Sequence, residues 1–163
     1  MRHSLINDTI CRTLVRAGIS ASREPTGLLV GSALRPDGVT LIPWARDKCL
    51  AWGATVSDTL AASHLSSTQH TAGSAANLAA VNKRNKYSGL DSKLTFVAVA
   101  VETLGPWSDE GLKFVEELGR RTSVKTGDPR ETTFLFQRIG VAIQRGNAAS
   151  VSGSLPSCDL SEL

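Results

Sequence analysis

The stretch from Leu94 to Val101, LTFVAVAV, places the tightest constraint on how this chain can fold. It carries no charge and is rich in β-branched side chains, a pattern typical of a strand that is buried on both faces. Such a strand needs helices on both sides of its sheet to keep it away from water. Because helical patterns stand before and after it, the run predicts an α/β domain with a small central mixed sheet and flanking helices, in which this strand is central.

The other elements follow from apolar spacing and from start and stop signals. An amphipathic helical pattern begins near the N-terminus and stops at Gly18. Ser108 is a suitable cap for a later helix. The last helix is expected to have Asp128 as its cap and Pro129 at its first position, with Glu131 closing a capping box, and to end at residues 146–147. The remaining expected elements are a short strand near 27–31, a hairpin over 35–55, an irregular segment over 57–70, a helix over 71–87 and a loose tail over 151–163.

The hairpin, RPDGVTLIPWARDKCLAWGAT, raises the question of function. It opens with Asp37, turns at the ARDK segment and returns as a second strand. Nucleases use such a hairpin to hold carboxylates and a lysine around Mg²⁺, since the metal generates hydroxide and neutralises charge in the transition state. On the return strand, positions 53 and 55 share one face and would carry the acid and the lysine. This chain has Gly53 and Thr55 there, so the segment is a nuclease site, a damaged one or an ordinary hairpin.

Acidic residues elsewhere could approach such a metal: Asp47 in the turn, Asp58 after the return strand and Glu102 at the end of the buried strand. Spacing singles out none of them. The lysine has a more specific substitute. Lys83 and Lys86 continue the four-three spacing of a stripe of alanines in the helix over 71–87, which directs a side chain toward the sheet. Either lysine then contacts a substrate phosphate, or its stem covers apolar surface while its ammonium reaches solvent.

Composition and charge limit the class of protein. Hydrophobic residues make up 41% of the chain, and its longest apolar run is too short to cross a bilayer, so no membrane partner is expected. The net charge is +3; no acidic residue lies between Glu131 and Asp159, and NKRNKY at 82–87 adds three cations, a pattern that favours a nucleic-acid partner. The three cysteines are far apart, which predicts reduced thiols in an intracellular protein and no zinc ribbon.

Several of these segments occur together in a known family. They are RHSLIND at 2–8, RPDG at 35–38, AWGATVSDT at 51–59, KRNKY at 83–87, VAVETLG, GRRTSVKTGD and FLFQRIGVAIQRGNA. Taken in order over residues 2–150, they resemble the restriction-like endonuclease domain of PD-(D/E)xK type. That domain is found after the reverse transcriptase in the C-terminal part of non-LTR retrotransposon polyproteins. The resemblance implies a restriction-endonuclease-like fold over 2–150 and Mg²⁺-dependent cleavage of DNA.

The resemblance also assigns expected roles to residues. Asp37 becomes the metal ligand, and Lys83 or Lys86 the active-site lysine that has moved from the strand to a helix, as in a Lys-x-x-Lys-Tyr motif. Glu102 is retained as a further catalytic candidate. By the same comparison the second catalytic acid falls on Gly53, which has no side chain to bind a metal. A degenerate site with impaired cleavage and weakened Mg²⁺ binding is therefore expected, with no small-molecule cofactor.

Three functions remain open at this point. The chain is an endonuclease-like domain with impaired cleavage, a non-catalytic DNA-binding module or an inactive remnant that merely folds. For DNA, the candidate contacts are Arg2, His3, Arg35, Arg138 and Arg145, joined by the two lysines. His3 contacts phosphate, orients a site group or lies exposed at the chain end. Arg138 and Arg145 share one helix face, which is also typical of an ordinary solvated face. The expected location is intracellular, and it includes the nucleus if the chain acts on DNA there.

Overall fold

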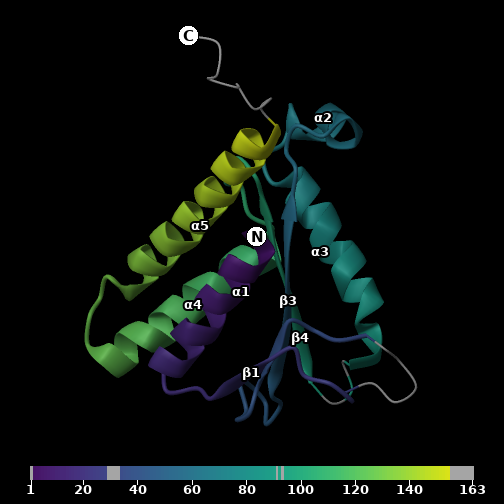
Figure 1. The fold of residues 1–163 in the computed structure, drawn as a ribbon. Coiled ribbons are helices and arrows are strands. Elements are labelled where there is room, and N and C mark those ends of the chain that lie inside the picture. The colour runs from purple at the N-terminus through teal and green to yellow at the C-terminus, as the bar shows by residue number, and fades with distance from the viewer. Residues whose placement is uncertain (1, 29–33, 91, 93, 155–163) are drawn as a thin grey trace, which may run out of the picture.

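The computed structural model describes residues 2–28, 34–90, 92 and 94–154. Its centre is a four-stranded mixed sheet in the order β1-β2-β3-β4 (Figure 1). The strands are β1 (Ala21–Arg23), β2 (Gly38–Thr40), β3 (Leu50–Ser57) and β4 (Thr95–Glu102). β1 pairs with β2 and β2 with β3 in antiparallel fashion, whereas β3 and β4 are parallel. The expected α/β class with a small mixed sheet is confirmed.

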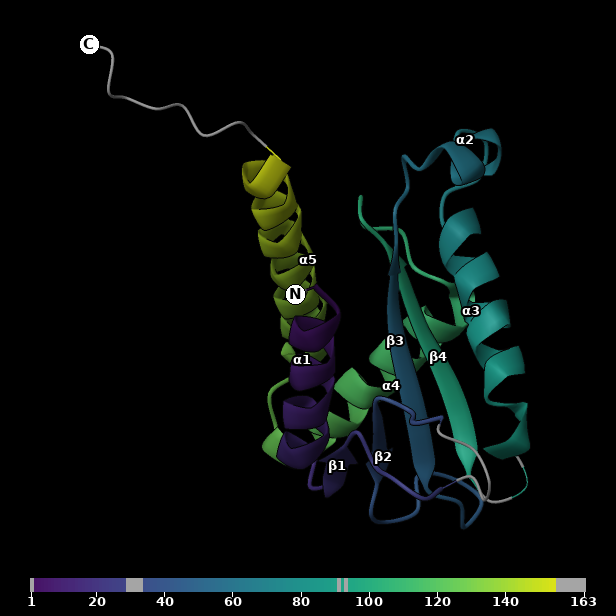
Figure 2. The ribbon, with the colours of Figure 1, turned by 45° about the vertical axis from the view of Figure 1, so that its right-hand side comes forward.

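Helices cover both faces of the sheet (Figure 2). One face packs against α1 (Arg2–Arg16), α4 (Asp109–Thr126) and α5 (Glu131–Ser154), and their apolar side chains join the fully buried Trp52 in the larger core cluster. The other face is covered by α3 (Ser74–Lys86), which the short α2 (Ala62–Thr68) precedes and the 3₁₀ turn η1 (Ser88–Leu90) follows. No helix of the described ranges is long and apolar enough to cross a bilayer.

The predicted hairpin is present. Arg46 and Asp47 both have positive φ, 48° and 58°, between the bridge partners Ala45 and Lys48. Two successive residues of positive φ match the twist of the flanking strands, so the ARDK turn joins β2 to β3 as predicted. The helix predicted over 71–87 is α3, which begins three residues later because Gly73, at φ 82°, precedes it.

Local patterns failed at two places before α3. The strand β1 was not predicted. Of the strand expected near 27–31, residues 27–28 form a bend and residues 29–31 lie outside the described residues. The segment over 57–70 was predicted to be irregular, and this is wrong, because α2 lies within it. This helix is short, buries no residue and receives no side-chain cap, so it leaves little trace in the pattern of apolar residues.

β4 is buried as predicted but is not central. Among the described residues its only strand partner is β3, so it stands at the end of the sheet. Its outer edge is paired by other means: Ala98 donates its backbone N–H to Glu110 of α4, and the carbonyl of Ala100 accepts from the N–H of Ser108. Ser108 also caps α4 through Gly111, as its sequence signal predicted. An edge covered in this way allows a strand to be apolar without a second neighbour.

The last helix has its predicted Asp128 cap but differs from the prediction in its capping box and at its C-terminal end. The Asp128 carboxylate accepts from the Arg130 N–H, but Glu131 closes no capping box; it is buried and paired with Arg16 of α1. The helix does not end at residues 146–147. A Cβ on Gly146 would lie 1.9 Å from Cγ of Arg2, so this glycine allows α1 and α5 to approach closely and is not a stop signal. Of the predicted loose tail, 151–154 are helical, and the rest lies outside the described residues.

Candidate functional site

Asp37 lies at the point where β2 begins, opposite Gly53 of β3. The register pairs Gly38 with Trp52, and the N–H of Asp37 donates to the carbonyl of Trp52 at 2.9 Å. The Asp37 carboxylate turns back over β3, and its Oδ2 accepts from the N–H of Ala54 at 2.6 Å. β2 extends no further along β3, so this side chain provides an acceptor that a longer strand would have supplied.

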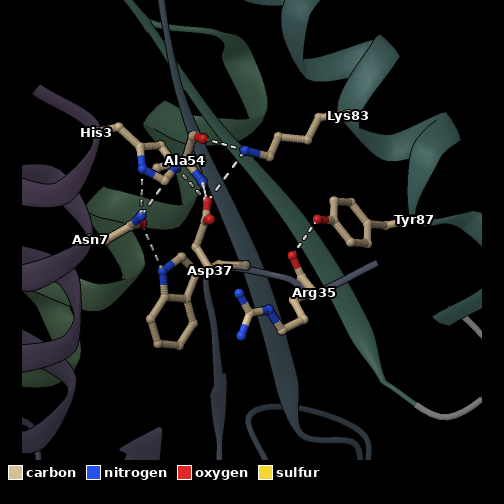
Figure 3. A network of polar contacts seen from close by, with 8 residues as sticks. His3, Asn7, Arg35, Asp37, Ala54, Lys83 and Tyr87 are labelled. Carbon is tan, nitrogen blue, oxygen red and sulfur yellow. Dashed lines mark hydrogen bonds and ion pairs between the residues drawn. The ribbon is translucent and has the colours of Figure 1, made fainter. Parts of the chain in front are cut away.

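Lys83 reaches the same place from α3 on one face of the sheet (Figure 3). The buried Ala76 and Ala80 place this face of α3 against the sheet, and Lys83 follows on the same stripe. Its Nζ lies 3.3 Å from Oδ2 of Asp37 and donates to the carbonyl of Ala54. Both charged side chains are largely buried, with 18% exposed for the lysine and 16% for the aspartate. The predicted meeting of the hairpin aspartate and the helix lysine is confirmed as geometry.

Gly53 provides the space through which Lys83 passes. A Cβ at this glycine would lie 2.5 Å from Cε and 3.2 Å from Cδ of Lys83, and 3.2 Å from Cζ of Phe96. Ordinary carbon contacts lie at about 3.5–4.0 Å, so any side chain here requires the lysine to move. The position expected to hold a second acid is therefore filled by the lysine stem.

The opposite face supplies a chain of hydrogen bonds from α1. His3 Nε2 lies 3.1 Å from Oδ2 of Asp37, and the amide nitrogen of Asn7 lies 3.3–3.4 Å from the two His3 ring nitrogens. Asn7 in turn accepts from the indole N–H of the fully buried Trp52 at 3.3 Å. The buried indole and amide thus hold His3 beside the carboxylate, although the imidazole is 49% exposed.

These contacts and the burial of the site shift the pKa values of Asp37 and Lys83, the ion pair of this site. Burial by itself raises the pKa of Asp37, but the hydrogen bond from His3, the Lys83 ammonium and the Ala54 N–H together outweigh it and lower the pKa below its ordinary value. For Lys83, burial dominates and lowers the pKa, against the attraction of Asp37; the neighbouring Lys86 lowers it further. The net effect favours an ionised carboxylate at neutral pH.

Cationic and aromatic side chains surround the pair. The Tyr87 hydroxyl donates to the carbonyl of Arg35, and its ring stacks on Phe96 with centroids 4.7 Å apart. Burial, with a smaller contribution from the Asp37 charge, raises the pKa of Tyr87. Lys86 is exposed and places its Nζ 5.6 Å from the centre of that ring. Tyr87 therefore ties the end of α3 to the loop that carries the exposed Arg35 and then Asp37.

As arranged, the residues do not fit a magnesium ion. Mg²⁺ requires several oxygen ligands at about 2.0–2.1 Å in near-octahedral geometry. Asp37 is the carboxylate at this position, and its Oδ2 already accepts from three nitrogen donors. In the part of the chain that the structure describes, no group of three or more His, Cys, Asp or Glu side chains lies in a metal-binding arrangement.

The remaining sequence candidates are not brought to this site. Glu102 lies four residues further along β4 than Ala98, the partner of Gly53, which is roughly 13 Å away. It is fully buried, and its Oε1 accepts from the first N–H groups of α3, those of Ala75 and Ala76, at 3.1 and 3.4 Å. Its place at the start of a helix that ends near Asp37 is structural support, not a contact with the pair. Asp47 is exposed in the turn, and Asp58 binds the N–H of Leu60.

The candidate DNA contacts divide into separate locations. Arg2 donates to Oδ1 of Asn147 at 2.6 Å and lies against α5. Arg138 and Arg145 are exposed on α5, where they line a groove of about 620 Å³ shared with Leu5 of α1. Asp37 and Lys83 are not among the residues that line this groove. Of the arginine and histidine candidates, His3 and Arg35 lie at the carboxylate and its loop, as Lys83 does.

Comparison with protein families and with curated proteins gives no match. No protein-family model matches the chain, and no curated protein is significantly similar to it. The function is therefore inferred from the geometry of the site.

Sequence reasoning missed the roles of Asn7, Trp52 and the Ala54 backbone. His3 and Asn7 are four residues apart, a spacing that places two side chains on one face of a helix, so a signal for their contact was present. Trp52 is completely buried, and its bond to Asn7 depends on the approach of α1 to β3. The Ala54 backbone groups have no sequence signature.

Proposed function

We propose that the chain is a DNA endonuclease-like domain of the PD-(D/E)xK restriction-like type, derived from a non-LTR retrotransposon polyprotein, with impaired phosphodiester cleavage. The observation that carries the proposal is the convergence of Asp37, at the start of a hairpin, with Lys83 from a neighbouring helix beside Gly53. A mixed sheet with helices on both faces supports it, because Lys83 is held on α3 and Asp37 directly precedes β2.

Cleavage is impaired for a chemical reason. Metal-dependent hydrolysis of a phosphodiester needs charge compensation at the attacked phosphorus and a nucleophilic hydroxide. With Gly53 in place of an acid, Asp37 is left to supply the carboxylate, and its oxygen is occupied by nitrogen donors. The residues at this site can position a phosphate and stabilise its charge through Lys83, but those that the structure describes do not assemble the ligands that generate a nucleophile.

The DNA-facing surface in this proposal is the region around Asp37. The exposed Arg35 precedes it on the loop, and the exposed Lys86 follows one turn after Lys83 on α3. Exposed cations held on short, anchored segments suit contact with the phosphate backbone, which determines position and carries no sequence information. Arg84 is less suitable because its guanidinium is paired with Glu110 of α4.

A second candidate function is a DNA-binding module without catalysis. The position of Lys83 favours it, since an ammonium bound to Asp37 and to the Ala54 carbonyl leaves that carboxylate neutralised. In this case the site is a rigid support for the neighbouring cations. Both candidates require DNA binding, and they differ only in whether Mg²⁺ adds strand cleavage.

Two measurements test the proposal. In EDTA, anisotropy of a labelled duplex between about 50 and 200 mM salt should show affinity that falls with salt, with a slope of about −0.9 for each phosphate contacted. Arg35→Ala and Lys86→Ala should each reduce that slope by about 1, whereas Arg138→Ala, on the far helix, should leave it unchanged. The absence of binding at low salt would refute both functions.

The second measurement is nicking of supercoiled plasmid with Mg²⁺ or Mn²⁺. Slow nicking that disappears in Asp37→Ala would support the endonuclease-like domain. Binding without any nicking would support the binding module. Strong nicking that survives Asp37→Ala would remove the site from this hairpin.

A further inference from the structure

We infer that the Lys83 ammonium is the resident cation of this site and takes the place that a divalent metal ion would occupy, so that removing its charge lets Asp37 and the Ala54 carbonyl bind a divalent metal ion more tightly than they do in the native chain. This deepens the proposed function and rests on its placement of the site at Asp37.

The surroundings of Lys83 Nζ are those of a bound cation. The ammonium contacts two oxygen atoms of different origin, Oδ2 of Asp37 and the backbone carbonyl of Ala54. Carboxylate and carbonyl oxygens are also the ligands that hard divalent cations prefer. The carbonyl of Ala54 and the carboxylate that binds its own N–H lie side by side, so one small cation is enough to meet both.

Gly53 makes this arrangement possible. The lysine stem crosses the glycine so closely that a Cβ there would lie 2.5 Å from Cε. An acidic residue at position 53 and the observed lysine conformation are therefore mutually exclusive. The ammonium can therefore reach this place because position 53 carries no acidic side chain.

The net charge of the site also favours the Lys83 ammonium over a divalent metal ion. One carboxylate and one ammonium sum to zero in a place where both side chains are more than four-fifths buried. One carboxylate with a divalent ion would leave a net positive charge there, beside the displaced ammonium and the nearby Lys86, whose charge already lowers the pKa of Lys83. Poor solvation makes such an excess unfavourable. Metal entry thus requires Lys83 to leave or to lose its charge.

The test uses Mn²⁺, whose free EPR signal disappears on binding, with the whole chain and without DNA. The variants are Lys83→Ala and Lys83→Met, the second of which keeps most of the stem volume. Lys113→Met, at an exposed lysine of α4, is the matched control. Both Lys83 variants should bind one Mn²⁺ at least about tenfold more tightly than the native chain. The gain should be absent in Lys113→Met and should be lost when Asp37→Asn is added.

Two results would overturn the inference. One is Mn²⁺ binding by the native chain as tight as that of the variants and dependent on Asp37. The other is no gain in either Lys83 variant while its circular dichroism and unfolding midpoint show a folded protein. Because no DNA is present, these results are independent of the proposed function: a chain that binds no DNA could still gain the metal site, and a DNA-binding chain could fail to gain it.

Discussion

The close passage of Lys83 over Gly53 gives a stability prediction whose magnitude can be worked out from the contacts. In Gly53→Ala the new Cβ would lie 2.5 Å from Cε of Lys83, so the stem must withdraw by about 1 Å to reach an ordinary contact. Because the lysine stem is flexible, the ammonium then loses one of its two charge-assisted bonds, that to Asp37 or that to the Ala54 carbonyl. Bonds to charged groups contribute about 1.5–3 kcal/mol, and alanine is better than glycine in a strand by about 0.5–1 kcal/mol. We expect a net loss of about 1–2 kcal/mol.

The assay is urea unfolding followed by tryptophan fluorescence, since Trp52 is completely buried in the core. Gly140→Ala is the matched control, because a Cβ there meets nothing within 4 Å and the residue is helical. That variant should gain about 0.5–1 kcal/mol. The two substitutions should therefore shift the unfolding midpoint in opposite directions.

A double-mutant cycle isolates the lysine. In a Lys83→Ala background the clash with the stem is absent, while the 3.2 Å approach to Phe96 is the same in both backgrounds. Gly53→Ala should then be neutral or slightly stabilising, giving a coupling of about 2 kcal/mol between the two positions. An equal cost of Gly53→Ala with and without the lysine would refute the assignment of this glycine to the lysine's path.

Other contacts give three further predictions. Glu102→Ala removes the acceptor for the Ala75 N–H at the buried start of α3 and should lower the unfolding free energy by about 1–3 kcal/mol, whereas Glu102→Gln should lose less; urea unfolding measures both. The pKa of Asp37 is lowered in the folded protein, so its contribution to stability is complete above its unfolded pKa and is lost as pH falls through the folded pKa. The difference in unfolding free energy between the native chain and Asp37→Asn should therefore shrink from about pH 5 downward. If the unfolding free energies of the two proteins had the same pH dependence, this would be contradicted. Gly119→Ala, whose Cβ would lie 2.6 Å from the backbone Cα of Thr132, should push α4 from α5 and lower the melting temperature, at a cost of about 1–3 kcal/mol.

Much of the fold was predictable from local patterns. The apolar run that became β4 required helices on both faces, and the Ser108 cap located the start of α4. The spacing of alanines toward Lys83 predicted that this lysine points at the sheet, which the contact with Asp37 confirms. Each of these features depends on helix or strand periodicity, which neighbouring residues specify by themselves.

Other features arise only when distant segments meet. Gly146 resembles a helix stop, yet the approach of Arg2 from α1 makes it a packing residue in a continuing α5. β4 can lie at the end of the sheet because Glu110 of α4, and not another strand, accepts a hydrogen bond from its outer edge. The apolar pattern of a strand does not show which element pairs with its edge. The bond between Asn7 and Trp52 spans 45 residues and depends on how closely α1 approaches β3.

By itself, the sequence determined which side chains were available at the site: a carboxylate at the start of a hairpin, a lysine on a packing stripe and a position with no side chain. The tertiary structure alone decided that the lysine passes through the empty position and binds the carboxylate and the Ala54 carbonyl. The physical reason is that periodicity sets the direction of a side chain, whereas its partner depends on the distance between elements that are far apart in the chain.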